Sequence, residues 1–184
     1  MPQNHITDEI EVVDHVTEWS AQFREEADRI QRALGNIFPV VVQMGSTGIP
    51  DLCAKPVIDI LVGVRDLDND RIVPALESMG YFFRRDTKGT GDLFFRKVPI
   101  RTHHIHVVRL YSWDFWKLVI FRDNLVHHPS LCAQYGELKR ISAEKYRFDR
   151  LAYVESKTEF IESVLKRATL EALITVEEQN TGSR

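Results

Sequence analysis

Residues 43–64 read QMGSTGIPDLCAKPVIDILVGV and join a glycine-serine turn, a short loop and an apolar strand. Ser46 follows Gly45 in a turn that can expose several backbone N–H groups. Asp59 interrupts the apolar run of residues 57–62. A carboxylate in a buried strand is costly unless it is paired or binds a cation. We therefore interpret Asp59 as a functional residue. The alternatives are an edge-strand position that faces water, or a hydrogen bond to nearby backbone.

The composition is that of an ordinary globular protein. The 184 residues are 43% hydrophobic and 28% charged, which suits one domain with its own core. The net charge of −3 gives no global positive field, so we expect no DNA partner. Cys53 and Cys132 lack metal-type spacing, and the sequence shows no secretory signal, so we expect a reduced cytoplasmic setting. No apolar run is long enough for a transmembrane helix, so we expect no membrane contact. We expect one domain over residues 1–173 and a loose polar tail over residues 174–184.

Hydrophobic periodicity divides the chain into helices and strands. We expect Thr17 to cap the first helix, Gly35 to end it in a left-handed conformation, and residues 86–92, DTKGTGD, to form a hairpin loop. Predicted helices cover residues 17–34, 68 or 69 to 80, 113–127 and 129–146, with a last helix that starts near 149 and buries Leu151, Val154, Thr158, Ile161 and Leu165. Predicted strands cover residues 38–44, 57–64, 81–84, 93–98 and 102–110. This order indicates an α+β domain, a small mixed β-sheet backed by helices.

Two histidines share one face of a predicted strand. In the segment His104-Ile105-His106, alternate side chains point the same way, and His103 is expected to face the opposite side. Two imidazoles on one face can bind a metal, hold a phosphate or move a proton. The alternative is a solvated sheet face without a task, because two histidines alone do not define a metal site.

Fixed cations near these groups would suit an anionic substrate. Lys55 precedes Asp59 by four residues, and Arg122 lies in a predicted helix. Each is a substrate-binding candidate if the fold brings it to the same cleft, and a solvated or salt-bridged surface residue otherwise. Tyr153 and Lys157 form a further polar pair at helical spacing, for which a solvated helix face is the favoured interpretation. Ser46 lacks the GxSxG surroundings of a hydrolase nucleophile.

Five segments resemble the GrpB family: GSTGIPDLCAKPVIDILVGV, HHIHVV, FRDNLVHHP, YVESKTEFIESVL and the opening EVVDHVTEWSAQFREEADRIQRALG. Together they span roughly residues 11–167. The family resembles the nucleotidyltransferase superfamily, whose mark is a glycine-serine turn followed by a strand aspartate. Ser46 and Asp59 match those positions. The resemblance implies a nucleotidyltransferase-like core with C-terminal helices.

The chain departs from these patterns in the same region. Leu61 stands where the superfamily usually has a second carboxylate, although Mg²⁺ can use a single protein carboxylate with substrate oxygens and water. A magnesium ion at Asp59 is therefore one expectation. Gln43, Gly48 and Asp51 stand where His, Ala and Gly are common in the GrpB pattern. These changes line one loop and suggest a substrate different from that of the usual bacterial members.

The resemblance implies a transferase acting on a small-molecule, nucleotide or aminoacyl-tRNA substrate that is activated by its nucleotide or tRNA linkage. One alternative is an aminoacyl-tRNA-dependent cyclodipeptide synthase that joins arginine to a second amino acid. Another is a non-enzymatic accessory domain of the kind fused to dephospho-CoA kinase. We expect Asp59, His104 and His106 to be catalytic. The expected substrate-binding residues are Gly45, Ser46, Thr47, Asp51, Lys55 and Arg122.

Overall fold

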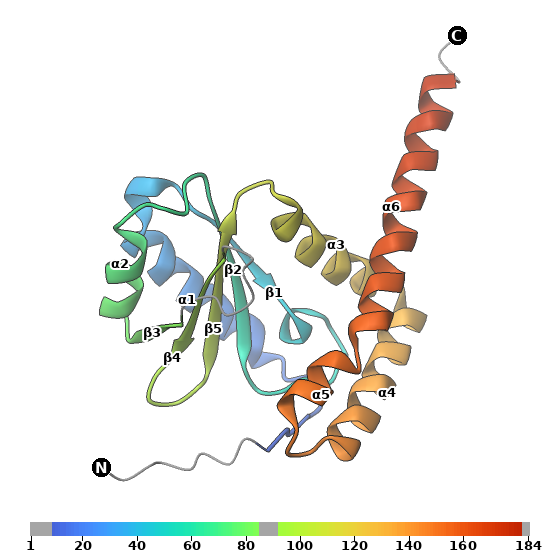
Figure 1. The fold of residues 1–184 in the computed structure, drawn as a ribbon, viewed down its shortest axis with the longest axis horizontal. Coiled ribbons are helices and arrows are strands. Elements are labelled where there is room, and N and C mark those ends of the chain that lie inside the picture. The colour runs from blue at the N-terminus through green and yellow to red at the C-terminus, as the bar shows by residue number, and fades with distance from the viewer. Residues whose placement is uncertain (1–8, 85–91, 182–184) are drawn as a thin grey trace.

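A five-stranded mixed sheet forms the centre of the protein, for which a computed structural model describes residues 9–84 and 92–181 (Figure 1). The strands are β1 Val40–Met44, β2 Ile58–Val64, β3 Tyr81–Arg84, β4 Leu93–Lys97 and β5 His103–Arg109. They lie in the order β1-β2-β5-β4-β3, with β2 and β5 parallel and the other neighbours antiparallel. The two strands predicted to carry the chemistry, β2 and β5, are therefore adjacent and central.

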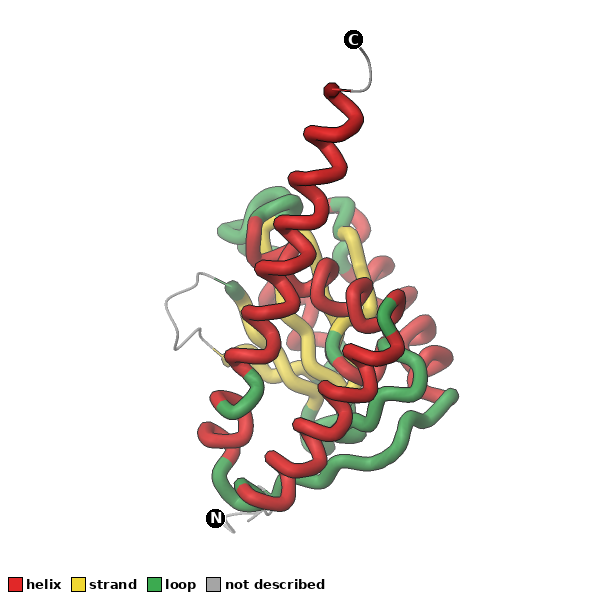
Figure 2. Tube along the Cα trace, turned by 90° about the vertical axis from the view of Figure 1, so that its right-hand side faces the viewer, coloured by secondary structure: helices red, strands yellow, loops and turns green. Residues whose placement is uncertain are grey.

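Helices cover both faces of this sheet (Figures 1 and 2). On one face lie α1 Glu18–Ala33 and α2 Ile72–Ser78; on the other lie α3 Trp113–His127, α4 Pro129–Lys145, α5 Arg150–Glu155 and α6 Thr158–Thr181. Short 3₁₀ turns occupy Gly35–Ile37 and Ser46–Gly48. The α+β prediction with a small mixed sheet is confirmed. No helix in the described part of the chain is long and apolar enough to cross a membrane.

The strand period of two assigns each residue of β2 to one of these faces. Ile58, Ile60 and Val62 are buried in a large apolar core together with residues of α1 and α2. Leu61 is buried in a smaller cluster with Phe115 of α3. Asp59 alternates with Ile58 and Ile60, so it lies on the α3 side of the sheet together with Leu61.

Two predictions about the first helix are wrong in detail. The Thr17 side chain makes no capping hydrogen bond and instead donates from Oγ1 to Glu18 Oε2 at 3.2 Å. The chain does not turn left-handed at Gly35, which starts a 3₁₀ turn; the left-handed residue is Phe38, with φ 51°. Side chains cap two later helices, because Ser112 Oγ accepts from Phe115 N and Asp149 Oδ1 accepts from Ala152 N.

The C-terminal helix differs most from its prediction. It breaks after Glu155, and α6 begins at Thr158. The predicted buried stripe lies on the wrong side of the helix: Leu151 and Val154 are exposed, at 68% and 40%, and so is Thr158, while Tyr153 and Lys157, four residues apart, are buried. The backbone of α6 continues to Thr181, through most of the segment expected to be a loose tail. The β3–β4 hairpin is present, but its predicted loop lies outside the described residues except for Asp92.

Candidate active site

Asp59 lies at the centre of the polar region on the α3 side of the sheet. Its Oδ1 atom is 3.1 Å from His104 Nδ1, and the two residues are paired across β2 and β5. The Asp59 side chain is 30% exposed. Burial opposes ionisation, but the hydrogen bond and charge of His104, together with His106 and Lys55, outweigh it and lower the pKa of Asp59. The carboxylate is therefore charged at neutral pH and accepts a hydrogen bond.

The glycine-serine turn packs directly against this carboxylate. Gly45 has φ +68°, and a Cβ atom at this position would lie 2.7 Å from Asp59 Oδ2. Glycine is thus required both by the backbone conformation and by the close approach of the carboxylate. Ser46 is half-buried and Thr47 is 1% exposed. The predicted proximity of the turn to Asp59 is confirmed by this geometry.

The two histidines of β5 lie on the same face, as expected. His104 is 8% exposed, and its Nε2 atom is buried without a hydrogen-bond partner among the residues that the structure describes. The ring of Phe94 from β4 lies 5.2 Å from the His104 ring and 4.9 Å from the His106 ring, measured between centroids. His106 is half-buried, and its charge helps to lower the pKa of Asp59. The two imidazoles therefore share an environment with the carboxylate.

Lys55 belongs to the same region. It acts electrostatically on Asp59, and its Nζ atom lies 5.7 Å from the centroid of the Tyr153 ring. Burial, with Arg150 and Arg101 nearby, lowers the pKa of Lys55, while Asp59 opposes the shift. The fold therefore places this predicted substrate-binding lysine next to the predicted catalytic carboxylate.

Two further lysines were not identified as site residues from the sequence. Lys139 of α4 is 3% exposed and its Nζ atom donates to Cys53 O. Lys157, between α5 and α6, is 9% exposed, and its Nζ atom lies 3.3 Å from the centroid of the Tyr153 ring. The interpretation of Tyr153 and Lys157 as a solvated helix face is therefore wrong. The repeated pattern Tyr-x-x-x-Lys, at residues 135–139 and 153–157, is the sequence signal that could have indicated both lysines.

Asp51 and Arg122 occupy other positions. Asp51 is exposed with φ 62°, near enough to Cys132 that, with burial, it raises the pKa of that thiol. Arg122 Nη1 donates to Gln43 O at 2.7 Å, and its Nε atom donates to Asp123 at 2.7 Å. Arg122 thus attaches α3 to the end of β1, immediately before the turn. Contact of either residue with a substrate stays a prediction.

The groups around Asp59 do not fit a resident magnesium ion. No group of three or more His, Cys, Asp or Glu side chains in the described ranges could hold a metal. Mg²⁺ prefers oxygen ligands, but Asp59 is bonded to His104, and the charges nearest to it are those of His104, His106 and Lys55. Leu61, at the position of the usual second carboxylate, is fully buried in an apolar cluster.

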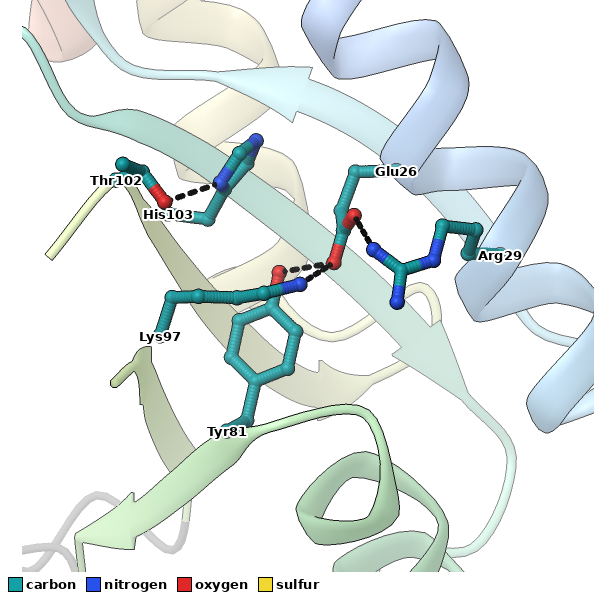
Figure 3. A network of polar contacts seen from close by, with 6 residues as sticks. All are labelled: Glu26, Arg29, Tyr81, Lys97, Thr102 and His103. Carbon is teal, nitrogen blue, oxygen red and sulfur yellow. Dashed lines mark hydrogen bonds and ion pairs between the residues drawn. The ribbon is translucent and has the colours of Figure 1, made fainter. Parts of the chain in front are cut away.

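A second buried polar network lies on the α1 face of the sheet (Figure 3). Glu26 is 4% exposed and accepts from Tyr81 Oη at 2.8 Å, Lys97 Nζ at 2.5 Å and Arg29 Nη1 at 2.7 Å. Burial opposes its ionisation, but these partners lower the pKa of Glu26. Next to it, His103 Nδ1 lies 2.9 Å from Thr102 Oγ1, and its side chain is on the Glu26 side of the sheet, the side predicted for it. The network connects α1, β3 and β4.

Comparison with known proteins adds a family and a fold. A family model described as GrpB protein matches residues 9–167. A UPF0157 protein of Pseudomonas aeruginosa is 39% identical over 167 residues, covering 88% of this chain and 68% of that protein. The crystal structure of the conserved protein GrpB from Enterococcus faecalis superimposes with a TM-score of 0.81 at 30% identity, covering 89% of this chain and 99% of that one.

A more distant likeness concerns the fold alone. The structure of the GLD-2/RNP-8 complex matches with a TM-score of 0.52 at 14% identity, over 78% of this chain and 58% of that chain. The predicted α+β domain is confirmed, and its fold is shared with the Enterococcus faecalis GrpB protein and, over a smaller part, with a chain of the GLD-2/RNP-8 complex.

Proposed function

This chain belongs to the GrpB family, and from this premise we propose that it is a transferase acting on an activated nucleotide- or tRNA-linked substrate. The observation that carries the proposal is the Asp59–His104 pair. The Gly45 turn packs against Asp59, and His104 Nε2 has no hydrogen-bond partner among the described residues. His103 Nε2 is also buried without a partner among the described residues, but of these two histidines only His104 pairs its other ring nitrogen with a carboxylate. In a group-transfer reaction, an imidazole paired in this way can remove a proton from the nucleophile.

The chemistry of the pair follows from its donors and acceptors. An ionised carboxylate only accepts hydrogen bonds, so His104 Nδ1 donates to Asp59 Oδ1. This bond fixes the tautomer in which Nε2 of a neutral ring carries the lone pair. Nε2 would then accept the proton of an attacking hydroxyl or amine, and Asp59 would stabilise the imidazolium that forms.

The surrounding residues would position the substrate. Lys55, which is close enough to affect the charge of Asp59, would hold an anionic part of the activated group. His106 and the ring of Phe94 would line the side of the dyad. Ser46 and Thr47 would border it from the turn. No step depends on a metal, because the residues around Asp59 do not fit one.

The experiment is untargeted mass spectrometry of cells that express the wild type, Asp59→Asn or His104→Gln. We expect a product of the wild type that falls by about 10²- to 10⁴-fold in both variants, the usual contribution of a general base. His103→Gln is the matched control, because this neighbouring histidine faces the other side of the sheet; it should leave the product unchanged. Equal metabolite profiles for wild type and both variants, at equal amounts of folded protein, would contradict the proposal.

The identity of the product shows whether the substrate is linked to a nucleotide or to tRNA. A nucleotidylated metabolite, with heat of binding for a nucleoside triphosphate in calorimetry, supports the nucleotide-linked substrate. An arginine-containing diketopiperazine in the medium supports the tRNA-linked substrate.

A further inference from the structure

Two lysines from different parts of the chain contact the Tyr153 ring, and a third, Lys139, donates to the backbone of Cys53, two residues before Lys55. Lys157 Nζ lies 3.3 Å and Lys55 Nζ 5.7 Å from the centroid of the Tyr153 ring. Lys139 is close enough to influence both of these lysines electrostatically. Lys55 precedes β2, Lys139 belongs to α4 and Lys157 links α5 to α6, so the cluster exists only in the folded protein.

The cluster carries more positive than negative charge. Among the residues that the structure describes, neither Lys157 nor Lys139 has an ion pair; the Lys139 ammonium donates to Cys53 O and lies 5.6 Å from the centroid of the Tyr135 ring. The carboxylate that acts on Lys55 and Lys139 is Asp59, which is bonded to His104. Arg150 adds a further positive charge near Lys55 and Lys157. Buried charges of one sign are costly unless a counter-charge is present.

The ionisation of the lysines reflects this imbalance. Burial, together with Lys55, Lys139 and Arg150, lowers the pKa of Lys157 to about 7. Burial and Lys55 lower the pKa of Lys139 to about 8, although Cys53, Asp59 and Cys132 act in the opposite direction. Tyr153 does not supply the missing negative charge, because burial raises its pKa to about 12. An anion between the ammonium groups would reverse these shifts.

We propose that Lys55, Lys139 and Lys157 form a subsite that binds the terminal phosphates of a nucleotide substrate. The proposal rests on the proposed function, since it places the anion of the activated substrate beside the Asp59–His104 pair. A free terminal phosphate suits residues that are only 3% and 9% exposed, whereas a nucleic-acid backbone needs a continuous exposed basic surface. A Schiff-base reaction would require one amine and gives no reason for three.

The test is calorimetry with inorganic tripolyphosphate, in two buffers of different ionisation enthalpy at pH 8. A lysine with a pKa of about 7 is mostly neutral at this pH and would be protonated when the anion binds. Lys139, with a pKa of about 8, is half neutral at pH 8, so we expect binding with uptake of at least about one proton. Lys157→Met should weaken binding at least tenfold. The matched control is Lys166→Met, an exposed lysine of the adjoining helix α6, which should bind as the wild type does.

Further measurements separate this inference from the proposed function. His104→Gln should keep tripolyphosphate binding while it loses the product. ATP should compete with tripolyphosphate, whereas uncharged tRNA should not. Thermal denaturation of Lys157→Met checks that the variant is folded. If it is unfolded, the proton uptake on binding to the wild type still tests the inference. Absence of binding by the wild type, binding without proton uptake, or competition by tRNA but not by ATP would overturn the inference, whatever product the cells contain.

Discussion

The two faces of the sheet carry buried polar networks of opposite character. On the α1 face, the carboxylate of Glu26 accepts hydrogen bonds from Tyr81, Lys97 and Arg29 (Figure 3). On the other face, Lys139 and Lys157 are buried without a carboxylate bound to either among the described residues. Both networks shift pKa values, but we call only the first balanced, because its two cations both contact a carboxylate while neither buried lysine of the second does. Charge balance, rather than burial, separates a network that stabilises the fold from one suited to a ligand.

The largest effect is expected from removing the acid of the balanced network. Glu26→Ala leaves Lys97 and Tyr81 without their buried partner, which should lower the free energy of unfolding by about 3–5 kcal/mol. Glu25→Ala, at an exposed neighbouring position, should change it by less than about 0.5 kcal/mol. Urea denaturation of the two variants measures the difference. Equal stability would mean that the Glu26 network does not support the fold.

A smaller effect should follow from filling the space above Asp59. Gly45→Ala forces a side chain into the left-handed region and places Cβ 2.7 Å from Asp59 Oδ2, so we expect a loss of about 1–3 kcal/mol. Gly35→Ala is the control, because its φ is not positive and no atom lies within 4 Å of the added Cβ. Gly35→Ala should leave the free energy of unfolding unchanged or raise it by about 0.4–1 kcal/mol. If Gly45→Ala is as stable as the wild type in denaturant, the turn is not tightly packed on the carboxylate.

The smallest effect distinguishes the networks by pH. Lys157 has a folded pKa of about 7 against an ordinary value of 10.5, so between these values the unfolded chain binds more protons. Stability therefore rises with pH in that window, and the penalty is complete below pH 7. Lys157→Met should stabilise the protein by about 1 kcal/mol at pH 7, and the gain should shrink toward pH 10.

The balanced network responds in the opposite range. The pKa of Glu26 is lowered from 4.5, so its stabilisation is present above that pH and is lost as pH falls through the folded value. Thermal denaturation from pH 7 to 10 thus isolates the lysine contribution. Two results would contradict the assignment of unbalanced charge. One is a Lys157→Met variant that is less stable than the wild type at pH 7. The other is a stability difference between variant and wild type that is the same at every pH.

The sequence predicts the centre of the site because local rules determine it. Strand alternation places Asp59 opposite the apolar face and His104 on the same side as His106, and a glycine-serine turn leads into the strand pair. These rules require only that β2 and β5 be neighbours. The boundaries of α3, residues 113–127, follow equally from the Ser112 cap and from Pro129.

The lysine cluster could not be predicted in the same way, because it depends on tertiary packing. The buried side chains of this region, Tyr153, Lys157 and Val164, follow one helical stripe, which turns Lys157 inward and leaves Leu151 outside. Periodicity had favoured the apolar residues for the interior. Arg122 shows the related difficulty that a charged side chain can serve a distant backbone carbonyl, here that of Gln43, which no local pattern reveals.

The most direct measurement of the central claim is ¹⁵N NMR of the imidazole nitrogens of the ligand-free protein, assigned with His104→Gln. Because Asp59 Oδ1 accepts from Nδ1, we predict that the neutral His104 ring carries its proton on Nδ1 and leaves Nε2 bare. Asp59→Asn should alter the shift of Nδ1. A proton on Nε2 with a bare Nδ1, unchanged in Asp59→Asn, would show that the carboxylate does not orient the ring and would contradict a general-base role for His104.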